Sequence, residues 1–181
     1  MTPKQFARLS IKSKRRVVVE DAIAQIKAGK YVPARFMYMD QCAMGCHVCA
    51  LGSMLVSCAR AEKPDAEVSE IQKTDYFEMS LNKLFTEVEL GEIEMAFEGR
   101  YGGAFSRRVC LNARKVISLD AYRARAKCPR IGQEEPNAQA ADRKAVLCIL
   151  HNIRRNGAFI VADTRGPTAR KPWTQTKTAV C

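Results

Sequence analysis

The chain has no long apolar run. Its 181 residues contain no uninterrupted apolar stretch of about 18 residues, the length that a helix needs to cross a bilayer. The first residues lead into charged side chains and not into the apolar core of a secretory signal. We therefore predict a cytoplasmic protein that does not enter a membrane.

Histidine is scarce as well, and motifs typical of enzymes are missing. The only two histidines are His47 and His151, so a nucleophile has few imidazole bases to activate it. No Walker loop and no dinucleotide fingerprint occurs. The glutamates of residues 87–98 are interpreted as a solvated helix face. The sequence leaves enzymatic activity undecided and favours a non-enzymatic protein without catalytic residues.

Acidic residues are absent from the first 16 positions, which carry six lysines and arginines. Residues 61–99 carry eleven acids against three lysines, and residues 100–130 carry nine basic residues against one aspartate. The total net charge is +11. This asymmetry fits a polyanionic or acidic partner. The alternative is that the acidic and basic segments fold against each other.

Composition and periodicity predict a mainly α fold of the α+β type. With 47% apolar and 27% charged residues, residues 1–163 suit one globular domain, followed by a flexible basic tail over residues 164–181. Helical spacing predicts a bundle of about five or six helices. The expected helices cover residues 13–28, 48–59, 76–85, 86–99 and 138–155, and residues 64–74 are expected to form a loop. Residues 30–33 and 158–162 are predicted to pair in a two- or three-stranded ribbon.

Eight cysteines make up about four per cent of the chain, well below the range of disulfide scaffolds. Several lie within apolar runs, as Cys148 does, where a thiol packs as a small hydrophobe. We therefore expect reduced cysteines, with Cys49 and Cys58 in the core and Cys42 and Cys46 half-buried.

Cys42, Cys46 and Cys49 follow the spacing C-x3-C-x2-C, which resembles the iron–sulfur loop of radical S-adenosylmethionine enzymes. The βα units that such enzymes place behind the loop are not predicted here. A zinc site, which places fewer demands on the surrounding fold, is the alternative, with Cys42, Cys46, His47 and Cys49 as ligands. We expect no cofactor, with zinc or an iron–sulfur cluster as the alternative.

The basic segment supplies the candidates for a nucleic-acid or partner interface. Arginine forks suit phosphate groups, and interleaved aromatic rings can stack on bases. The sequence contains no recognisable DNA- or RNA-binding module. The candidate residues are Tyr101, Arg107, Arg108, Arg114, Lys115, Tyr122, Arg123, Arg125, Lys127 and Arg130.

Three fragments, at residues 46–52, 92–99 and 149–159, together resemble small uncharacterised proteins of bacteriophages and prophages. The resemblance implies a phage or mobile-element accessory protein in the bacterial cytoplasm. Such proteins act by binding host machinery, so an anti-defence, anti-CRISPR-like inhibitor of a host nucleoprotein complex is the leading hypothesis. Direct DNA or RNA binding through residues 100–130 is the first alternative, and a metal- or cluster-dependent protein is the second.

Overall fold

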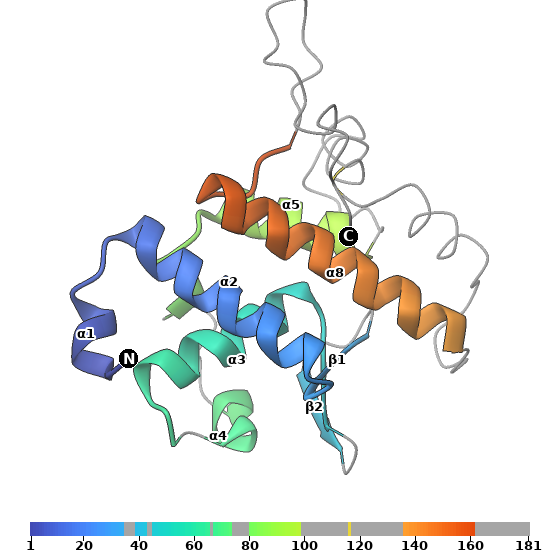
Figure 1. Cartoon of the computed structure of the whole chain (residues 1–181), viewed down its shortest axis with the longest axis horizontal. Helices are drawn as coiled ribbons and strands as arrows, with labels where there is room; N and C mark the ends of the chain where they lie inside the picture. The colour runs from blue at the N-terminus through green and yellow to red at the C-terminus, as the bar shows by residue number, and fades with distance from the viewer. Residues whose placement is uncertain are drawn as a thin grey trace, which may run out of the picture.

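The computed structural model describes residues 1–34, 39–42, 45–65, 67–73, 80–98, 116 and 136–161. This part of the chain is mainly helical with one small three-stranded sheet, which confirms the predicted fold class (Figure 1). The helices are α1 (Pro3–Ala7), α2 (Ile11–Lys27), α3 (Ala50–Glu62), α4 (Val68–Lys73), α5 (Glu87–Glu98) and α8 (Pro136–Asn156). The strands are β1 (Tyr31–Pro33), β2 (Met39–Cys42) and β3 (Gly45–Val48).

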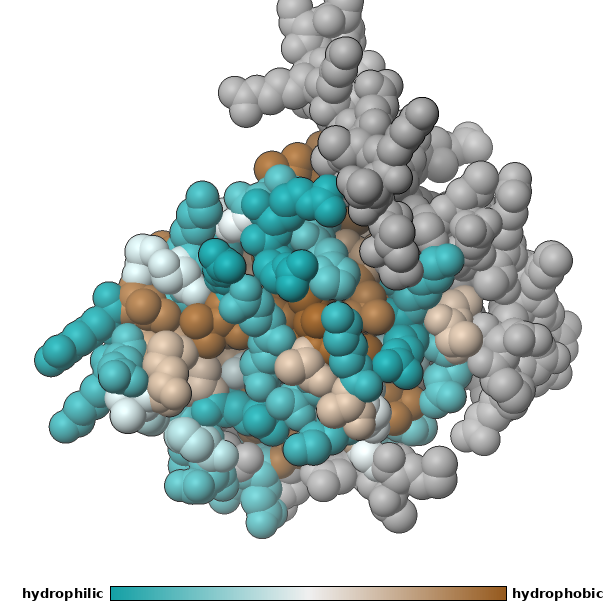
Figure 2. All heavy atoms as spheres, in the orientation of Figure 1, coloured by the Kyte–Doolittle hydropathy of each residue, from teal (hydrophilic) through white to brown (hydrophobic). Residues whose placement is uncertain are grey.

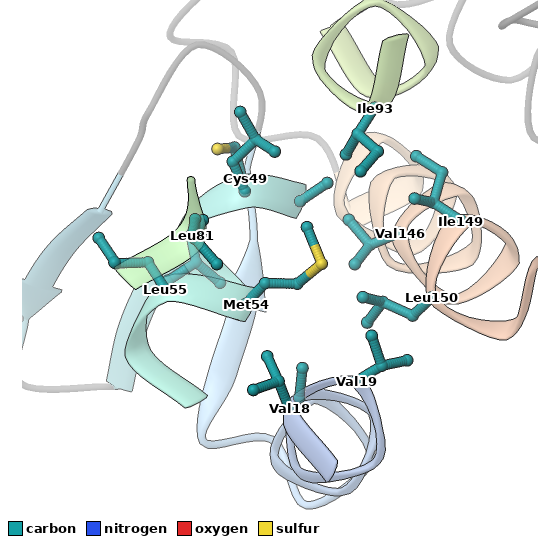
Figure 3. Packing of buried hydrophobic residues seen from close by; sticks show 14 of the residues in the cluster. Val18, Val19, Cys49, Met54, Leu55, Leu81, Ile93, Val146, Ile149 and Leu150 are labelled. Atoms are coloured by element: carbon teal, nitrogen blue, oxygen red, sulfur yellow. The ribbon is translucent and has the colours of Figure 1, made fainter. Parts of the chain in front are cut away.

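Helix α3, which matches the helix predicted over residues 48–59, lies at the centre of the helices. All of its residues from Ala50 to Ala59 are buried, because α2, α5 and α8 pack around it. Met54 extends from α3 towards Val146 and Leu150 of α8, with Val18 of α2 close by (Figure 3). The unbranched thioether of Met54 can fill the irregular space between three helices.

Helices α2 and α8 run antiparallel along one side of the molecule (Figure 1). Near the end of α2, Arg143 of α8 donates a hydrogen bond to the carbonyl of Lys27 at 3.3 Å. Near its beginning, Arg15 donates to the carbonyl of Gly157 just beyond α8, at 3.1 Å. The first long helix and the last described helix are therefore joined along their length.

Side-chain caps set the starts of several helices. A capping box begins α5, because the amide of Glu89 donates to Thr86 Oγ1 at 3.2 Å and the amide of Thr86 donates to the Glu89 carboxylate at 2.9 Å. Ser10 caps α2, which therefore begins two residues before the predicted start. Helix α1 was not predicted, although Thr2 and Gln5 form a second capping box there.

The sheet has the strand order β1-β3-β2, with β1 parallel and β2 antiparallel to β3. Tyr31 pairs with Cys46, and Met39 pairs with Val48. Strand β1 lies at an edge, as Pro33 requires. The predicted ribbon between residues 30–33 and 158–162 is wrong, because β3 occupies the paired side of β1.

Residues 158–161 do not form the predicted strand, and residue 162 lies outside the described part. The side chain of Asn152 in α8 explains the difference. Its amide donates to the carbonyl of Ile160 at 3.0 Å and its oxygen accepts from the amide of Ile160 at 3.0 Å. The two backbone groups that a neighbouring strand would need are therefore already bonded.

The structure also differs from the loop predicted over residues 64–74 and from the helix predicted over residues 76–85. Part of the expected loop at residues 64–74 is the short helix α4, which Ile71 anchors to the core with 1% of its surface exposed. Of the helix predicted over residues 76–85, only residues 80–85 are described, and there the chain turns so that Leu84 and Phe85 bond back to the carbonyl of Leu81. The predicted tail over residues 164–181 lies outside the described residues.

None of the helices in the described ranges combines the length and the apolar character that crossing a lipid bilayer demands.

Candidate binding surface

The ten candidate interface residues between Tyr101 and Arg130 all lie outside the described residues. The nucleic-acid interface predicted over residues 100–130 therefore stays a prediction. Among the basic residues that the structure describes, most belong to α2 and α8.

Helix α8 divides into a buried arc and an outward arc. Asp142, its only acidic residue, is 6% exposed, and Val146, Ile149, Leu150 and Ile153 of the same helix are fully buried. The remaining side chains of residues 143–155 fall within an arc of about 120°, given 3.6 residues per turn. The outward arc holds Arg143, Lys144, Leu147, His151, Arg154 and Arg155.

The C-terminal end of α2 lies next to this arc. Lys27 is exposed at its C-terminal end, where its carbonyl accepts the bond from Arg143. In the view of Figure 2, hydrophilic side chains lie over α8 and the neighbouring part of α2. We call Lys27, Arg143, Lys144, Arg154 and Arg155 the basic surface. Only the folded chain brings Lys27 next to the four cations of α8, which lie more than one hundred residues away in the sequence.

His151 lies within the basic surface. Burial lowers the pKa of His151, and the positive charges of Arg154, Lys27 and Arg155 lower this pKa further. The imidazole is therefore neutral at neutral pH. No described carboxylate is among the charges that act on this ring.

The basic residues at the start of α2 have three different environments. Lys14 lies over the ring of Phe6, 5.7 Å from its centre, and Arg16 forms an exposed pair with Glu20 at 2.9 Å. Arg15 is largely buried and forms two hydrogen bonds with the Glu89 carboxylate, at 3.0 and 2.8 Å. Arg15 is therefore neither a solvated surface cation nor available to a polyanionic partner.

The Arg15–Glu89 pair joins the basic N-terminal segment to the acidic middle segment. To this extent the two oppositely charged segments do fold against each other. The charges of two other glutamates of α5, Glu94 and Glu98, raise the pKa of Cys49. Burial, with the charge of Glu89, raises the pKa of Glu92.

The candidate metal ligands are distributed over a hairpin and a helix cap. Cys46 is buried on β3, while His47 follows it on the other face of the strand. Cys49 caps α3, where its sulfur accepts a hydrogen bond from the amide of Gly52 at 3.3 Å. The side chain of Cys42 lies outside the described part. Within the part that is described, no three His, Cys, Asp or Glu side chains form a group that could hold a metal ion.

Burial raises the pKa of the Cys49 thiol to about 12 and that of Cys58 to about 12. Both are therefore protonated at neutral pH, whereas nucleophiles and metal ligands are thiolates. The prediction that Cys49 and Cys58 belong to the core is confirmed. Cys46 is more deeply buried than predicted, with 6% of its surface exposed.

The expectation that all cysteines are reduced is wrong for Cys148, which is disulfide-bonded. Its partner is not Cys46, Cys49 or Cys58, since these three are free. Cys148 is 3% exposed on the buried side of α8. The apolar residues around Cys148 in the sequence predicted its burial, but they did not show whether its sulfur is a free thiol or part of a disulfide.

A buried polar group at the start of the sheet was also not predicted. The hydroxyl groups of Tyr31 and Ser57 form no hydrogen bond of standard geometry with the described residues, but Ser57 is close enough to lower the pKa of Tyr31, and both residues are at least nine-tenths buried. Burial raises the pKa of Tyr31, with a further contribution from the charge of Asp21. Asp21 in turn pairs with Arg60 at 3.4 Å. No local motif marks these residues, because they come from three separate elements, α2, β1 and α3.

Known proteins give no independent guide to this surface. No protein-family model, no curated protein and no solved structure matches the chain.

Proposed function

We propose that this protein acts by binding, and that its basic surface holds the phosphate backbone of a nucleic acid, free or within a nucleoprotein complex. The outward arc of α8 carries the argument. It presents four cations and no acid, while the only acidic residue of the helix is buried.

The dimensions suit a phosphate backbone. From Arg143 to Arg155 the arc is about 18 Å long, at 1.5 Å per residue. One strand of duplex DNA carries a phosphate about every 3.4 Å along its axis, so an arc of this length faces roughly five phosphates. Such contacts position a protein on nucleic acid without reading its sequence.

The resemblance to phage accessory proteins suggests the biological setting. It supports a host nucleoprotein complex as the partner, with inhibition of a defence complex as the outcome. A phage-protection assay in cells that carry a defined defence system tests this narrower proposal. Failure to protect against any such system would remove it without affecting the backbone-binding proposal.

Direct binding to labelled DNA and RNA tests the basic surface. We expect affinity that falls steeply with salt, since each neutralised phosphate releases counterions. The double variant Arg143→Ala/Arg154→Ala should weaken binding to all sequences alike and reduce the salt slope by about two.

Lys83→Ala is the matched control. Lys83 is also exposed, but it lies in the turn before α5 and not on the basic surface. It loses the same kind of charge as each substitution on α8 and should leave affinity unchanged. Equal effects of the control and of either α8 substitution alone would mean that net charge, and not this surface, governs binding. Unchanged affinity in the double variant would contradict the proposal.

A further inference from the structure

On the outward arc of α8 between residues 143 and 155, His151 is the only neutral polar residue. His151 lies between Arg143 and Arg154 on this arc and is half-buried. Arg154 and Arg155 follow it by three and four residues, the spacings that bring helical side chains together. Lys27 approaches from α2.

We propose that binding of a phosphate backbone to the basic surface is coupled to proton uptake by His151, which thereby becomes an additional cation of that surface. This inference rests on the proposed function, since it concerns the same surface. It adds that the surface responds to pH.

The physical basis is the balance of charge around the ring. In the free protein the charges that act on His151 are those of Arg154, Lys27 and Arg155, all of the sign that opposes protonation. Helix α8 also packs against α3, α5 and β1, and no described carboxylate on these elements acts on the ring. A bound phosphate brings negative charge to the same place, offsets the three cations and favours the imidazolium ion.

The sign of the effect follows from linkage. A ligand that raises the pKa of a group binds more tightly to its protonated form. Affinity should therefore be greatest below the pKa of the free protein and should fall as the pH rises through the pKa of the complex. Each unit by which binding raises this pKa corresponds to about a tenfold difference in affinity between these limits.

Nuclear magnetic resonance can follow this proton directly, because the chain has two histidines. The imidazole signals of the full chain are titrated with pH, alone and with a saturating short DNA duplex. His47 lies on β3, and a His47→Gln variant assigns the signals. We expect the His151 midpoint to move to higher pH in the complex.

Affinity measurements give an independent result. Between about pH 8 and about pH 5.5, where unperturbed carboxylates remain ionised, affinity for the same duplex should rise several-fold in the wild type and in His47→Gln. The rise should be smaller in His151→Gln. Binding without movement of the His151 midpoint overturns this inference and leaves the proposed function intact. Absence of binding at every pH overturns both.

Discussion

Removing the charge of Arg15 is expected to cost a large part of the stability of this fold. Arg15 lies on α2, but its guanidinium group bonds the carbonyl of Leu84, both carboxylate oxygens of Glu89 and the carbonyl of Gly157. It also lies over the ring of Phe85, 4.7 Å from its centre. One side chain thus joins α2, the start of α5 and the end of α8.

The magnitude follows from burial. The side chains of Arg15 and Glu89 are only 13% and 16% exposed, so removal of the cation leaves a carboxylate with little access to water. Breaking a buried ion pair from one side costs about 3–5 kcal/mol. Against a total stability of about 5–15 kcal/mol for a domain, Arg15→Met should therefore shift the unfolding midpoint strongly.

Urea unfolding followed by circular dichroism measures this loss. Arg16→Met is the matched control, because the neighbouring pair Arg16–Glu20 is 68% and 44% exposed and should contribute about 0–1 kcal/mol. Glu89→Gln retains a residue that can complete the capping box, so a double-mutant cycle with Arg15→Met isolates the charge interaction. Equal losses in Arg15→Met and Arg16→Met would refute the reasoning.

Four further substitutions test other parts of the structure. Asn152→Ala should cost about 1–3 kcal/mol, since two backbone groups lose their partner, and hydrogen exchange at Ile160 should accelerate; unchanged exchange there would contradict the assigned bonds. Gly157→Ala and Gly29→Ala should each cost about 1 kcal/mol in thermal unfolding, because φ is +73° and +74° at these positions. The cost should be at least as large at Gly157, where a new Cβ would also meet a side chain. Glu92→Gln should stabilise the protein at neutral pH and lose this advantage as the pH falls through the raised pKa of Glu92, because the folded state already disfavours its charge; unfolding at several pH values checks this.

Much of the helical framework was predictable, because local signals mark it. Thr86 and Glu89 identify the start of α5, and Gly29 and Gly157 end their helices with the positive φ expected there. The helix predicted over residues 48–59 is also present, as α3. In these cases the residues that determine the element are neighbours in the sequence.

The features that failed depend on contacts between distant segments. An apolar stretch after α8 has the composition of a strand, but Asn152 takes the backbone bonds of Ile160. Arg15 has the sequence context of an exposed cation, and only the arrival of Glu89 and Gly157 buries it. The outward arc of α8 was hidden for the same reason, since its continuation on α2 is more than one hundred residues away.

The pairing of α2 with α8 also bears on how the chain folds as it is synthesised. The apolar sides of α2 and α3 emerge from the ribosome early, whereas Val146, Leu150 and Ile153, which cover them, are made more than eighty residues after α3 ends. Until then Val18 and Met54 lack part of their packing, so the growing chain exposes apolar surface for several seconds at usual translation rates. A chain that stops before α8 should therefore aggregate or recruit chaperones, and the last described helix acts as the step that closes the core.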